Sequence, residues 1–194
     1  MARTPSTMTL NLGQKAPDFD LLDVVSDQNI SLKGLEGAHA LLVMFVCNHC
    51  PFVIHVEDEL AALGRDYGPE GVAIVAISSN DVENYPADAP DKMEVYAREK
   101  GWLFPYLYDP DQSVAKSYFA ACTPDFYLFD SDQNLVYRGQ LDPSRPGNDI
   151  PVTGADLREA IDATLAGQKV NPDQFPSLGC NIKWLPNQVP DYFG

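Results

Sequence analysis

Two adjoining segments decide the fold of this chain: His39-Ala-Leu-Leu-Val-Met-Phe-Val46 and, directly after it, Cys47-Asn-His-Cys-Pro51. The first is an apolar run of the length expected for a buried strand, rich in Val, Leu and Phe. From Phe52 onward, apolar residues recur at helical spacing as far as position 67, so an amphipathic helix follows. The two cysteines therefore lie where a buried strand ends and a helix begins.

Cys47 and Cys50 form a C-x-x-C pair at this predicted helix N-terminus. Unpaired backbone N–H groups and the helix dipole favour an anion there, so we expect the placement to lower the pKa of the Cys47 thiol. Cys50 lies one helical turn further on and can close a small disulfide ring with Cys47. The pair therefore predicts a redox-active centre that exchanges electrons between dithiol and disulfide forms.

Composition places the chain among ordinary globular proteins: of its 194 residues, 45% are hydrophobic and 21% are charged. This length suits one domain, which we expect over residues 1–170, with a proline-rich tail over residues 171–194 packed on the same domain. The 28 acidic residues outnumber the 13 basic ones and give a net charge of −15. Such a field repels nucleic acid and anionic membranes, so neither is an expected partner.

Residues 1–7 contain no apolar stretch that resembles the core of a signal peptide, and no run in the chain approaches the length of a membrane span. We therefore expect a cytoplasmic protein. In that reducing compartment the four cysteines do not form a structural disulfide framework, so the C-x-x-C pair is expected to be catalytic or metal-binding.

The order of predicted elements is that of a mixed α/β domain. Gly71 opens a second apolar, β-branched run that ends at Ser78, and a strand, a helix and a strand of these lengths form a βαβ unit with a parallel strand pair. Before this unit, the pattern predicts a hairpin over residues 20–25 and 30–32. After it, we expect a short helix that ends near residue 100, an edge strand over 104–108 and a helix capped by Asp109. A second hairpin over 126–129 and 135–139, a last helix capped within 153–156 and a tail with little regular structure after residue 170 complete the chain.

Three motifs, spread along this order of elements, carry a resemblance to a known family. They are Ala16-Pro-Asp-Phe19, Cys47-Asn-His-Cys-Pro51 and Thr123-Pro-Asp-Phe-Tyr-Leu-Phe-Asp130. Over residues 13–166 the chain resembles the redoxin branch of thioredoxin-fold proteins, which comprises the peroxiredoxin-like AhpC/TSA proteins and the TlpA/ResA-type thiol–disulfide oxidoreductases. The resemblance implies an α/β, thioredoxin-like fold: a central mixed sheet flanked by helices, with an N-terminal β-hairpin and, here, an irregular C-terminal tail.

The resemblance also implies which residues do the chemistry. Cys47 and Cys50 are expected to be the catalytic pair, with His49 and Pro51 as supporting residues. A partly charged imidazole at His49 would further stabilise a thiolate at Cys47, and the alternative is a solvated loop histidine without that role.

The family's proline at the start of the second hairpin is cis and lies against the active-site cysteines. By motif match this proline is Pro124. The cis bond of the family leaves the backbone of the preceding residue free to meet a substrate peptide, so Thr123 and Pro124 are expected to bind substrate.

Two further thiols have more than one interpretation. Cys122, two residues before Pro124, is either a third redox thiol or, as we favour, a small buried residue. Cys180 is either a resolving thiol, if the tail folds back over the cleft, or part of a strap that packs Ile182 and Trp184 onto the body, which we favour.

A second histidine and the loop 80–91 also lie near the motif or on its edge of the predicted sheet. His55 lies one turn before Glu59 and predicts a surface ion pair rather than catalytic work. Tyr85 and Pro86 lie in the loop 80–91, at the carboxyl edge of the predicted sheet, where ligands of α/β proteins bind. They form either a lip that faces the substrate or a plain connection.

Three positions depart from the family pattern. Thioredoxins carry a buried acid six residues before the first cysteine, where this chain has Leu41, and TlpA/ResA-type proteins carry a glutamate six residues after it, where this chain has Val53. The usual carboxylate that shuttles protons is absent from both places, so the route by which Cys50 loses its proton is open. Peroxiredoxins bind peroxide with a threonine three residues before the reactive cysteine, where this chain has Met44.

These observations predict an enzyme, a thioredoxin-like thiol–disulfide oxidoreductase in which Cys47 attacks a substrate disulfide and Cys50 resolves it. The expected partner is a disulfide-containing protein or a small thiol, such as a thioredoxin or glutathione system, and no metal or organic cofactor is required. Two alternatives stay open: an antioxidant thiol peroxidase with Cys47 as the peroxidatic residue, and a non-enzymatic module that binds a metal through the same thiols. The sequence makes no prediction of the oligomeric state.

Overall fold

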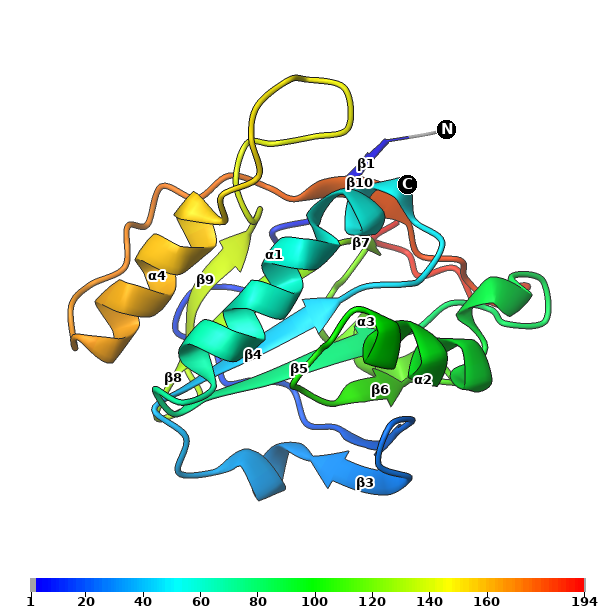
Figure 1. The fold of residues 1–194 in the computed structure, drawn as a ribbon, viewed down its shortest axis with the longest axis horizontal. Helices are drawn as coiled ribbons and strands as arrows, with labels where there is room; N and C mark the ends of the chain where they lie inside the picture. Colours follow the sequence, from blue (N-terminus) through cyan, green and yellow to red (C-terminus); the bar gives the residue numbers. More distant parts are fainter. Residues whose placement is uncertain (1–2, 194) are drawn as a thin grey trace.

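A seven-stranded mixed sheet forms the centre of the protein, whose computed structural model describes residues 3–193 (Figure 1). Its strands lie in the order β3-β2-β6-β5-β4-β8-β9. β4 pairs in parallel with β5, and β5 with β6, whereas the other neighbours are antiparallel. The strands are β2 (Asp20–Asp23), β3 (Gln28–Ser31), β4 (Ala40–Phe45), β5 (Val72–Ser78), β6 (Tyr106–Tyr108), β8 (Asp125–Asp130) and β9 (Leu135–Gly139).

β4 lies in the middle of the sheet because its side chains are apolar on both faces. Successive residues point to opposite sides, so Leu42 and Met44 enter one hydrophobic core while Leu41, Val43 and Phe45 enter the other. Three helices cover the first face and one short helix the second: α1 (Pro51–Tyr67), α2 (Pro90–Glu99) and α4 (Ala155–Leu165), then α3 (Ser113–Ser117). The predicted βαβ unit and both predicted hairpins are confirmed.

The C-terminal tail contributes a strand that the sequence does not predict. β10 (Leu178–Asn181) lies between β1 (Thr4–Pro5) and β7 (Cys122–Thr123) in a small antiparallel sheet. Beyond β10, the Ile182 backbone N–H donates a hydrogen bond to the Ala121 carbonyl oxygen at 3.0 Å, which continues the pairing with the segment before β7. Figure 1 shows this small sheet beside the N-terminal end of α1. The prolines of the tail permit the strand because none lies within it.

Two predicted elements differ in detail from the structure. An edge strand over 104–108 is wrong: β6 lies between β2 and β5, and Pro105 precedes the strand, so it removes no hydrogen bond from the ladder. A cap at Asp109 is also wrong, because α3 begins only after Gln112, which has a left-handed backbone. The Asp109 carboxylate nevertheless accepts a hydrogen bond from the Ala115 N–H at 3.0 Å and so satisfies the start of this helix.

Within residues 3–193, the structure contains no helix that is both long and apolar enough to cross a membrane.

Candidate functional site

Cys47 and Cys50 lie between the end of β4 and the start of α1. The Val46 N–H donates to the Ile77 carbonyl oxygen at 2.9 Å, which extends the pairing with β5 by one residue before the chain turns. Cys50 is the N-cap of α1 and Pro51 its first residue, a position that needs no N–H donor. Cys47 is 2% exposed, Cys50 is fully buried, and both are free thiols.

Thr123 contacts both sulfurs, and its peptide bond to Pro124 is cis. The Thr123 hydroxyl oxygen lies 3.5 Å from Cys47 Sγ, and the Thr123 carbonyl oxygen lies 3.1 Å from Cys50 Sγ. A carbonyl oxygen only accepts hydrogen bonds, so a protonated Cys50 donates its S–H to it. The segment that the resemblance implies for substrate binding therefore lies directly against the dithiol.

The two thiols share a proton in the reduced protein, and Cys50 is the sulfur that more readily becomes a thiolate. A hydrogen bond from Cys47 lowers the pKa of Cys50 to about 5, although burial opposes the shift. The same hydrogen bond, together with burial, raises the pKa of Cys47 well above its usual range. The expectation of a lowered pKa at Cys47 does not hold for the reduced pair, because the hydrogen bond with Cys50 and the burial of Cys47 both raise that pKa. The pair loses its first proton easily and its second with difficulty.

Asp88 holds the loop that carries the thiols, and the sequence analysis missed it. It is fully buried at the end of the short 3-10 helix η2 (Pro86–Asp88). Its carboxylate accepts hydrogen bonds from the Asn48 backbone N–H at 2.9 Å, the Asn80 side-chain amide at 2.8 Å and His49 Nδ1 at 2.6 Å. A buried carboxylate requires such donors, and here the donors are residues of the active-site loop itself.

His49 and Asp88 form an ion pair beside the dithiol. The hydrogen bond to Asp88 raises the pKa of His49, whose side chain is 30% exposed. Burial by itself raises the pKa of Asp88, but hydrogen bonds from His49 and Asn80 outweigh it, and the net effect is a lowered pKa. Because Asp88 occupies Nδ1, Nε2 is the ring nitrogen that is left for proton transfer.

Tyr85 and Lys183 complete the wall around this imidazole. The Tyr85 ring stacks on His49, with centroids 5.6 Å apart and planes at 9°, and Lys183 Nζ lies 5.6 Å from the Tyr85 centroid. Lys183 belongs to the tail, and its backbone N–H donates to Asn80 Oδ1 at 2.8 Å. Tyr85 is 38% exposed, so the loop after β5 lies at the surface beside His49.

The other two thiols, Cys122 and Cys180, lie on the paired strands β7 and β10, and both are buried. Burial raises the pKa of Cys122 well above its usual range. The pKa of Cys180 is raised to about 12 by burial and by a hydrogen bond with Cys50. The tail therefore folds back over the cleft and brings one more sulfur into contact with the dithiol, while Ile182 is buried as the strap interpretation expects.

Among residues 3–193, the acidic, histidine and cysteine side chains that approach closely enough to share a metal ion are Cys47, His49 and Asp88, with ligand atoms within 4.8 Å of one another. Zinc accepts all three ligand types, but a structural zinc site needs four ligands. The imidazole and carboxylate are also hydrogen-bonded to each other at 2.6 Å. The arrangement fits a His–Asp dyad beside a thiol better than a closed metal site.

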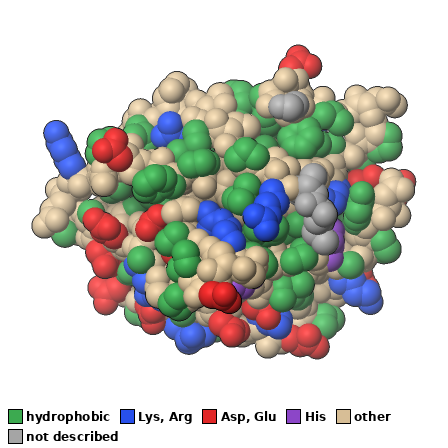
Figure 2. Space-filling model, turned by 90° about the horizontal axis from the view of Figure 1, so that it is seen from above, with side chains coloured by type: hydrophobic (Ala, Val, Ile, Leu, Met, Phe, Trp, Pro, Cys, Tyr) green, Lys and Arg blue, Asp and Glu red, His purple; other side chains and the backbone are tan. Residues whose placement is uncertain are grey.

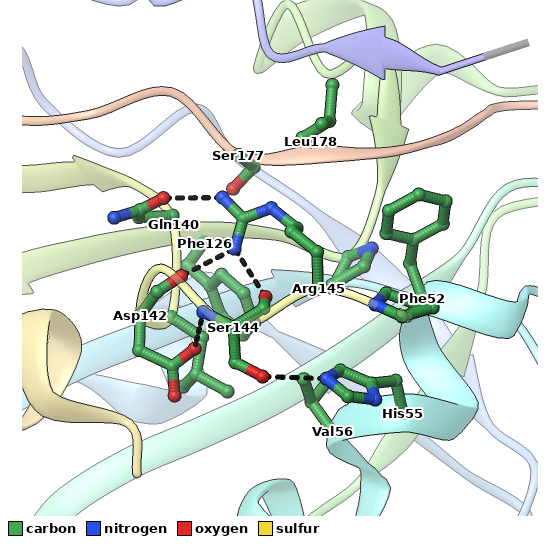
Figure 3. Close-up of a pocket in the computed structure, with 13 residues that line it drawn as sticks. Phe52, His55, Val56, Phe126, Gln140, Asp142, Ser144, Arg145, Ser177 and Leu178 are labelled. Carbon is green, nitrogen blue, oxygen red and sulfur yellow. Dashed lines mark hydrogen bonds between the residues drawn. The ribbon is translucent and has the colours of Figure 1, made fainter. Parts of the chain in front are cut away.

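A small pocket lies beside Pro124 (Figure 3). Phe52 and Phe126 form its apolar wall, and Arg145 lies on its polar side. The Arg145 guanidinium donates to the Asp142 carbonyl oxygen at 2.5 Å, which fixes its position. With a volume of about 20 Å³ the pocket holds little more than one water molecule, so it is a recess beside Pro124 and not a ligand cavity.

His55 does not form the ion pair with Glu59 that the sequence predicts. His55 Nε2 lies 2.7 Å from Ser144 Oγ, and that hydroxyl donates its own hydrogen to the Ile150 carbonyl oxygen at 2.6 Å, so His55 is the donor (Figure 3). Glu59 instead pairs with Arg158 of α4 at 2.5 Å. Elements distant in sequence cover this part of α1 and supply nearer partners. The serine is not an activated nucleophile, because its hydrogen is donated away from the histidine.

The face above the dithiol is not uniformly acidic, although the net charge is −15. Figure 2 shows the molecule from the side on which β1, β7 and β10 lie. Lys and Arg side chains occupy the middle of this view among hydrophobic ones, and many Asp and Glu side chains lie toward its edge.

Comparison with known proteins agrees with this geometry. The AhpC/TSA family matches residues 12–138. No curated protein matches the chain. Two similar solved structures are an uncharacterized conserved protein from Geobacillus kaustophilus (53% identity, TM-score 0.94, covering 96% of this chain and 98% of that one) and a hypothetical protein from Sinorhizobium meliloti 1021 (47% identity, TM-score 0.90, covering 92% and 97%).

A more distant structure shares the fold: a thiol:disulfide interchange protein of the thioredoxin family from Chlorobium tepidum TLS (17% identity, TM-score 0.62, covering 80% of this chain and 98% of that one). The α/β fold is therefore thioredoxin-like, as expected. Since the family match extends over more than half of its length, the chain belongs to the AhpC/TSA family.

Proposed function

We propose that this protein is a thiol–disulfide oxidoreductase that works through a Cys47–Cys50 dithiol. The observation that carries the proposal is the contact of both sulfurs with Thr123, next to the cis Pro124, at the N-terminus of α1. The helix terminus stabilises a thiolate, and the short spacing permits a disulfide. Thr123 and Pro124 are proposed to hold the backbone of a disulfide-containing substrate.

Cys47 is the proposed nucleophile as the first cysteine of the C-x-x-C pair, and Cys50, the N-cap of α1, is proposed to resolve the mixed disulfide. As Cys47 attacks one sulfur of a substrate disulfide, its proton passes to the Cys50 thiolate, the substrate S–S bond breaks, and the other substrate sulfur leaves as a thiolate. The Thr123 carbonyl oxygen, 3.1 Å away, then accepts a hydrogen bond from protonated Cys50. Cys50 subsequently attacks Cys47, which releases the substrate as a dithiol and leaves Cys47–Cys50 oxidised.

The second step requires Cys50 to lose a proton, and the carboxylates that relatives use for this are replaced by Leu41 and Val53. We assign the proton transfer to His49, with Asp88 as the residue that positions it. Protonated His49 gives its Nε2 proton to the leaving substrate thiolate, and the neutral ring can then take the proton from Cys50. The ion pair with Asp88 keeps Nε2 as the reactive nitrogen through both transfers.

A thiol peroxidase is the second candidate function, and one contact favours it. The Thr123 hydroxyl lies 3.5 Å from Cys47 Sγ, where it can donate to a peroxide oxygen although the family's threonine is replaced by Met44. In that reaction Cys47 is oxidised to sulfenic acid and Cys50 condenses with it to a disulfide and water. Consumption of hydrogen peroxide that depends on Cys47, and that exceeds the rate of a free thiol, distinguishes it from disulfide exchange.

The proposed reaction partner is a disulfide-bearing protein or a small thiol, and the proposed compartment is the cytoplasm. The four cysteines are all buried, and a C-x-x-C pair kept as a dithiol suits a reducing compartment. Cell fractionation tests this location, and it is needed because one protein of the same fold is a secreted disulfide oxidoreductase from Mycobacterium tuberculosis.

The test of the function is a glutathione redox titration of the whole protein with thiol counting by mass spectrometry. We expect a reversible loss of two thiols that maps to Cys47 and Cys50. A potential near about −270 mV indicates a reductase and one near about −120 mV an oxidant. Absence of any reversible two-electron couple overturns the proposal, and stoichiometric zinc in the freshly purified protein supports the metal-binding alternative.

A further inference from the structure

The pairing of β7 with β10 separates the two extra thiols onto opposite faces. Cys180 lies opposite Thr123, and Asn181 lies opposite Cys122. Directly opposed residues of an antiparallel pair project to the same face, and neighbours along a strand project to opposite faces. Because the Thr123 hydroxyl contacts Cys47, the shared face of Thr123 and Cys180 is the one that meets the dithiol.

The contacts of the sulfurs agree with this assignment. Cys180 is hydrogen-bonded to Cys50, and this contact contributes to the pKa shifts of both thiols. Cys122, in contrast, donates its S–H to the Pro124 carbonyl oxygen at 3.8 Å. Cys50 therefore has a sulfur neighbour on each side: Cys47 in its own loop and Cys180 in the tail strand.

Gly179 shows how closely the tail strand approaches. A Cβ atom at position 179 would lie 1.9 Å from the Thr123 carbonyl oxygen, a distance that no side chain tolerates. Glycine thus permits the backbone of β10 to lie directly against the Thr123–Pro124 bond. Two residues after β10, the Lys183 carbonyl oxygen accepts a hydrogen bond from the Asp81 N–H at 2.9 Å, and this bond joins the tail to the loop after β5. Cys180 is therefore held in place beside Cys50.

We propose that Cys180 is a third redox thiol, which displaces Cys47 from the Cys47–Cys50 disulfide and forms a Cys50–Cys180 disulfide. This inference rests on the proposed dithiol chemistry. The Cys180 thiolate attacks Cys50 Sγ, the Cys50–Cys180 bond forms as the Cys47–Cys50 bond breaks, and Cys47 leaves as a thiolate that takes up the proton lost by Cys180. Nothing is oxidised or reduced overall, so the exchange needs no further reagent.

This exchange gives the oxidised protein two forms. In one, Cys47 is part of the disulfide, beside Thr123, and can be reduced by a partner. In the other, the disulfide joins the N-terminus of α1 to the tail strand, and Cys47 is again a thiol that can act as a nucleophile. Cys50 is the sulfur common to both forms.

Disulfide mapping of the full-length Cys47→Ser protein tests the proposal. Diamide is the oxidant, since it takes up the two electrons and two protons that a pair of thiols releases. Trypsin places Cys50 on the peptide 34–65, Cys122 on 117–138 and Cys180 on 170–183, so each linkage has its own mass. We expect the 34–65/170–183 linkage as the main product. It should persist in Cys47→Ser/Cys122→Ser and be lost in Cys47→Ser/Cys180→Ser.

A folded Cys47→Ser protein, verified by its near-UV circular dichroism, that gives no 34–65/170–183 linkage overturns the proposal, and so does a dominant linkage to 117–138. If Cys47→Ser does not fold, the wild type decides: after partial oxidation, a 34–65/170–183 linkage whose fragment ions place the bond on Cys50 supports the proposal, and its absence contradicts it. Failure of the proposed function has a different signature, because the wild type then shows no Cys47–Cys50 disulfide within peptide 34–65 in the glutathione titration.

Discussion

The dithiol lies between two unlike surroundings. On the side of the loop after β5, the neighbours are ionic and partly exposed: His49, its buried partner Asp88, and the stacked Tyr85. On the side of β7 and β10 the neighbours are buried, and they include Thr123 and a third sulfur, that of Cys180. The first side is suited to moving protons and the second to holding substrate backbone and exchanging disulfides. The difference separates acid–base chemistry from sulfur chemistry across a single pair of thiols.

The largest expected effect comes from removing the sulfurs that both sides serve. Cys47→Ser should lower disulfide-reductase turnover by at least about 1,000-fold, since the attacking nucleophile is gone. Cys50→Ser should instead accumulate mixed disulfides with substrate on Cys47, visible on non-reducing gels. Cys122→Ser is the matched control, because its sulfur lies on the opposite face of β7, and it should keep the wild-type rate. Full turnover in Cys47→Ser would contradict the mechanism.

Asp88→Asn tests the ionic side alone. We expect a loss of turnover of about 100-fold, the lower range for positioned acid–base catalysis. In the wild type, turnover should fall as the pH rises through the raised pKa of His49, because the protonated ring is the donor. Without Asp88 that pKa is no longer raised, so the fall should move to lower pH.

The control for this experiment is Asp91→Asn, whose carboxylate is exposed and pairs with Lys92 on the surface at 3.2 Å. Its pH profile should match the wild type. An Asp88→Asn profile that merely drops in height, with no displacement along the pH axis, would mean that Asp88 only supports the loop.

Gly179→Ala tests the buried side. The added methyl group meets the Thr123 carbonyl oxygen at 1.9 Å, so β10 must move away from β7. We expect the free energy of unfolding to fall by about 1–3 kcal/mol in urea titrations. Gly34→Ala is the control, since its Cβ would meet only Ser31 Oγ at 3.5 Å, and it should be close to neutral. Equal stability of the two variants would show that the tail strand lies further from Thr123.

The smallest expected effect is a contrast in pH dependence between two buried carboxylates. The lowered pKa of Asp88 means that its contribution to stability is present above the unfolded pKa of about 3.9 and is lost as the pH falls through the folded value. Burial raises the pKa of Asp125, on the other side of the dithiol, to about 7. The folded state then holds a proton that the unfolded state releases, so stability falls as the pH rises from about 4 to about 7.

Asp125→Asn should therefore flatten the decline in melting temperature between pH 4 and pH 7, relative to the wild type. The Tyr127 hydroxyl, which donates to Asp125 Oδ2 at 3.0 Å, can donate equally to the amide oxygen of asparagine. Asp88→Asn should leave that decline unchanged below about pH 6, where His49 is protonated in both states, and remove the loss of stability at low pH. If both variants alter the same pH range, the two sides of the dithiol do not titrate independently.

The sequence was sufficient for the features that depend on local order. The apolar run 39–46, the helical spacing after Phe52 and the turn residues between short strands specify the βαβ unit and the hairpins, because periodicity reports which faces are buried. The C-x-x-C spacing places Cys47 and Cys50 at a strand–helix junction without any tertiary information.

The tertiary structure decided the features that join distant segments. Asp88 lies 39 residues from His49, and nothing in the local pattern of a polar loop marks one aspartate as the buried partner of an imidazole. The prolines of the tail indicate irregular structure, yet β10 forms because the exposed edges of β1 and β7 offer hydrogen-bonding partners to a short segment between those prolines.

The chemical character of each sulfur was decided in the same way. The sequence determined that two thiols flank a helix start, but their pKa values depend on the proton that they share and on the buried contacts around them. Likewise, the sequence does not distinguish Cys122 from Cys180 as a neighbour of the dithiol. The register of β7 against β10 turns Cys180 toward the dithiol and Cys122 away from it. Spacing along the chain fixes local geometry, whereas pKa and sulfur contacts arise from groups that the fold alone brings together.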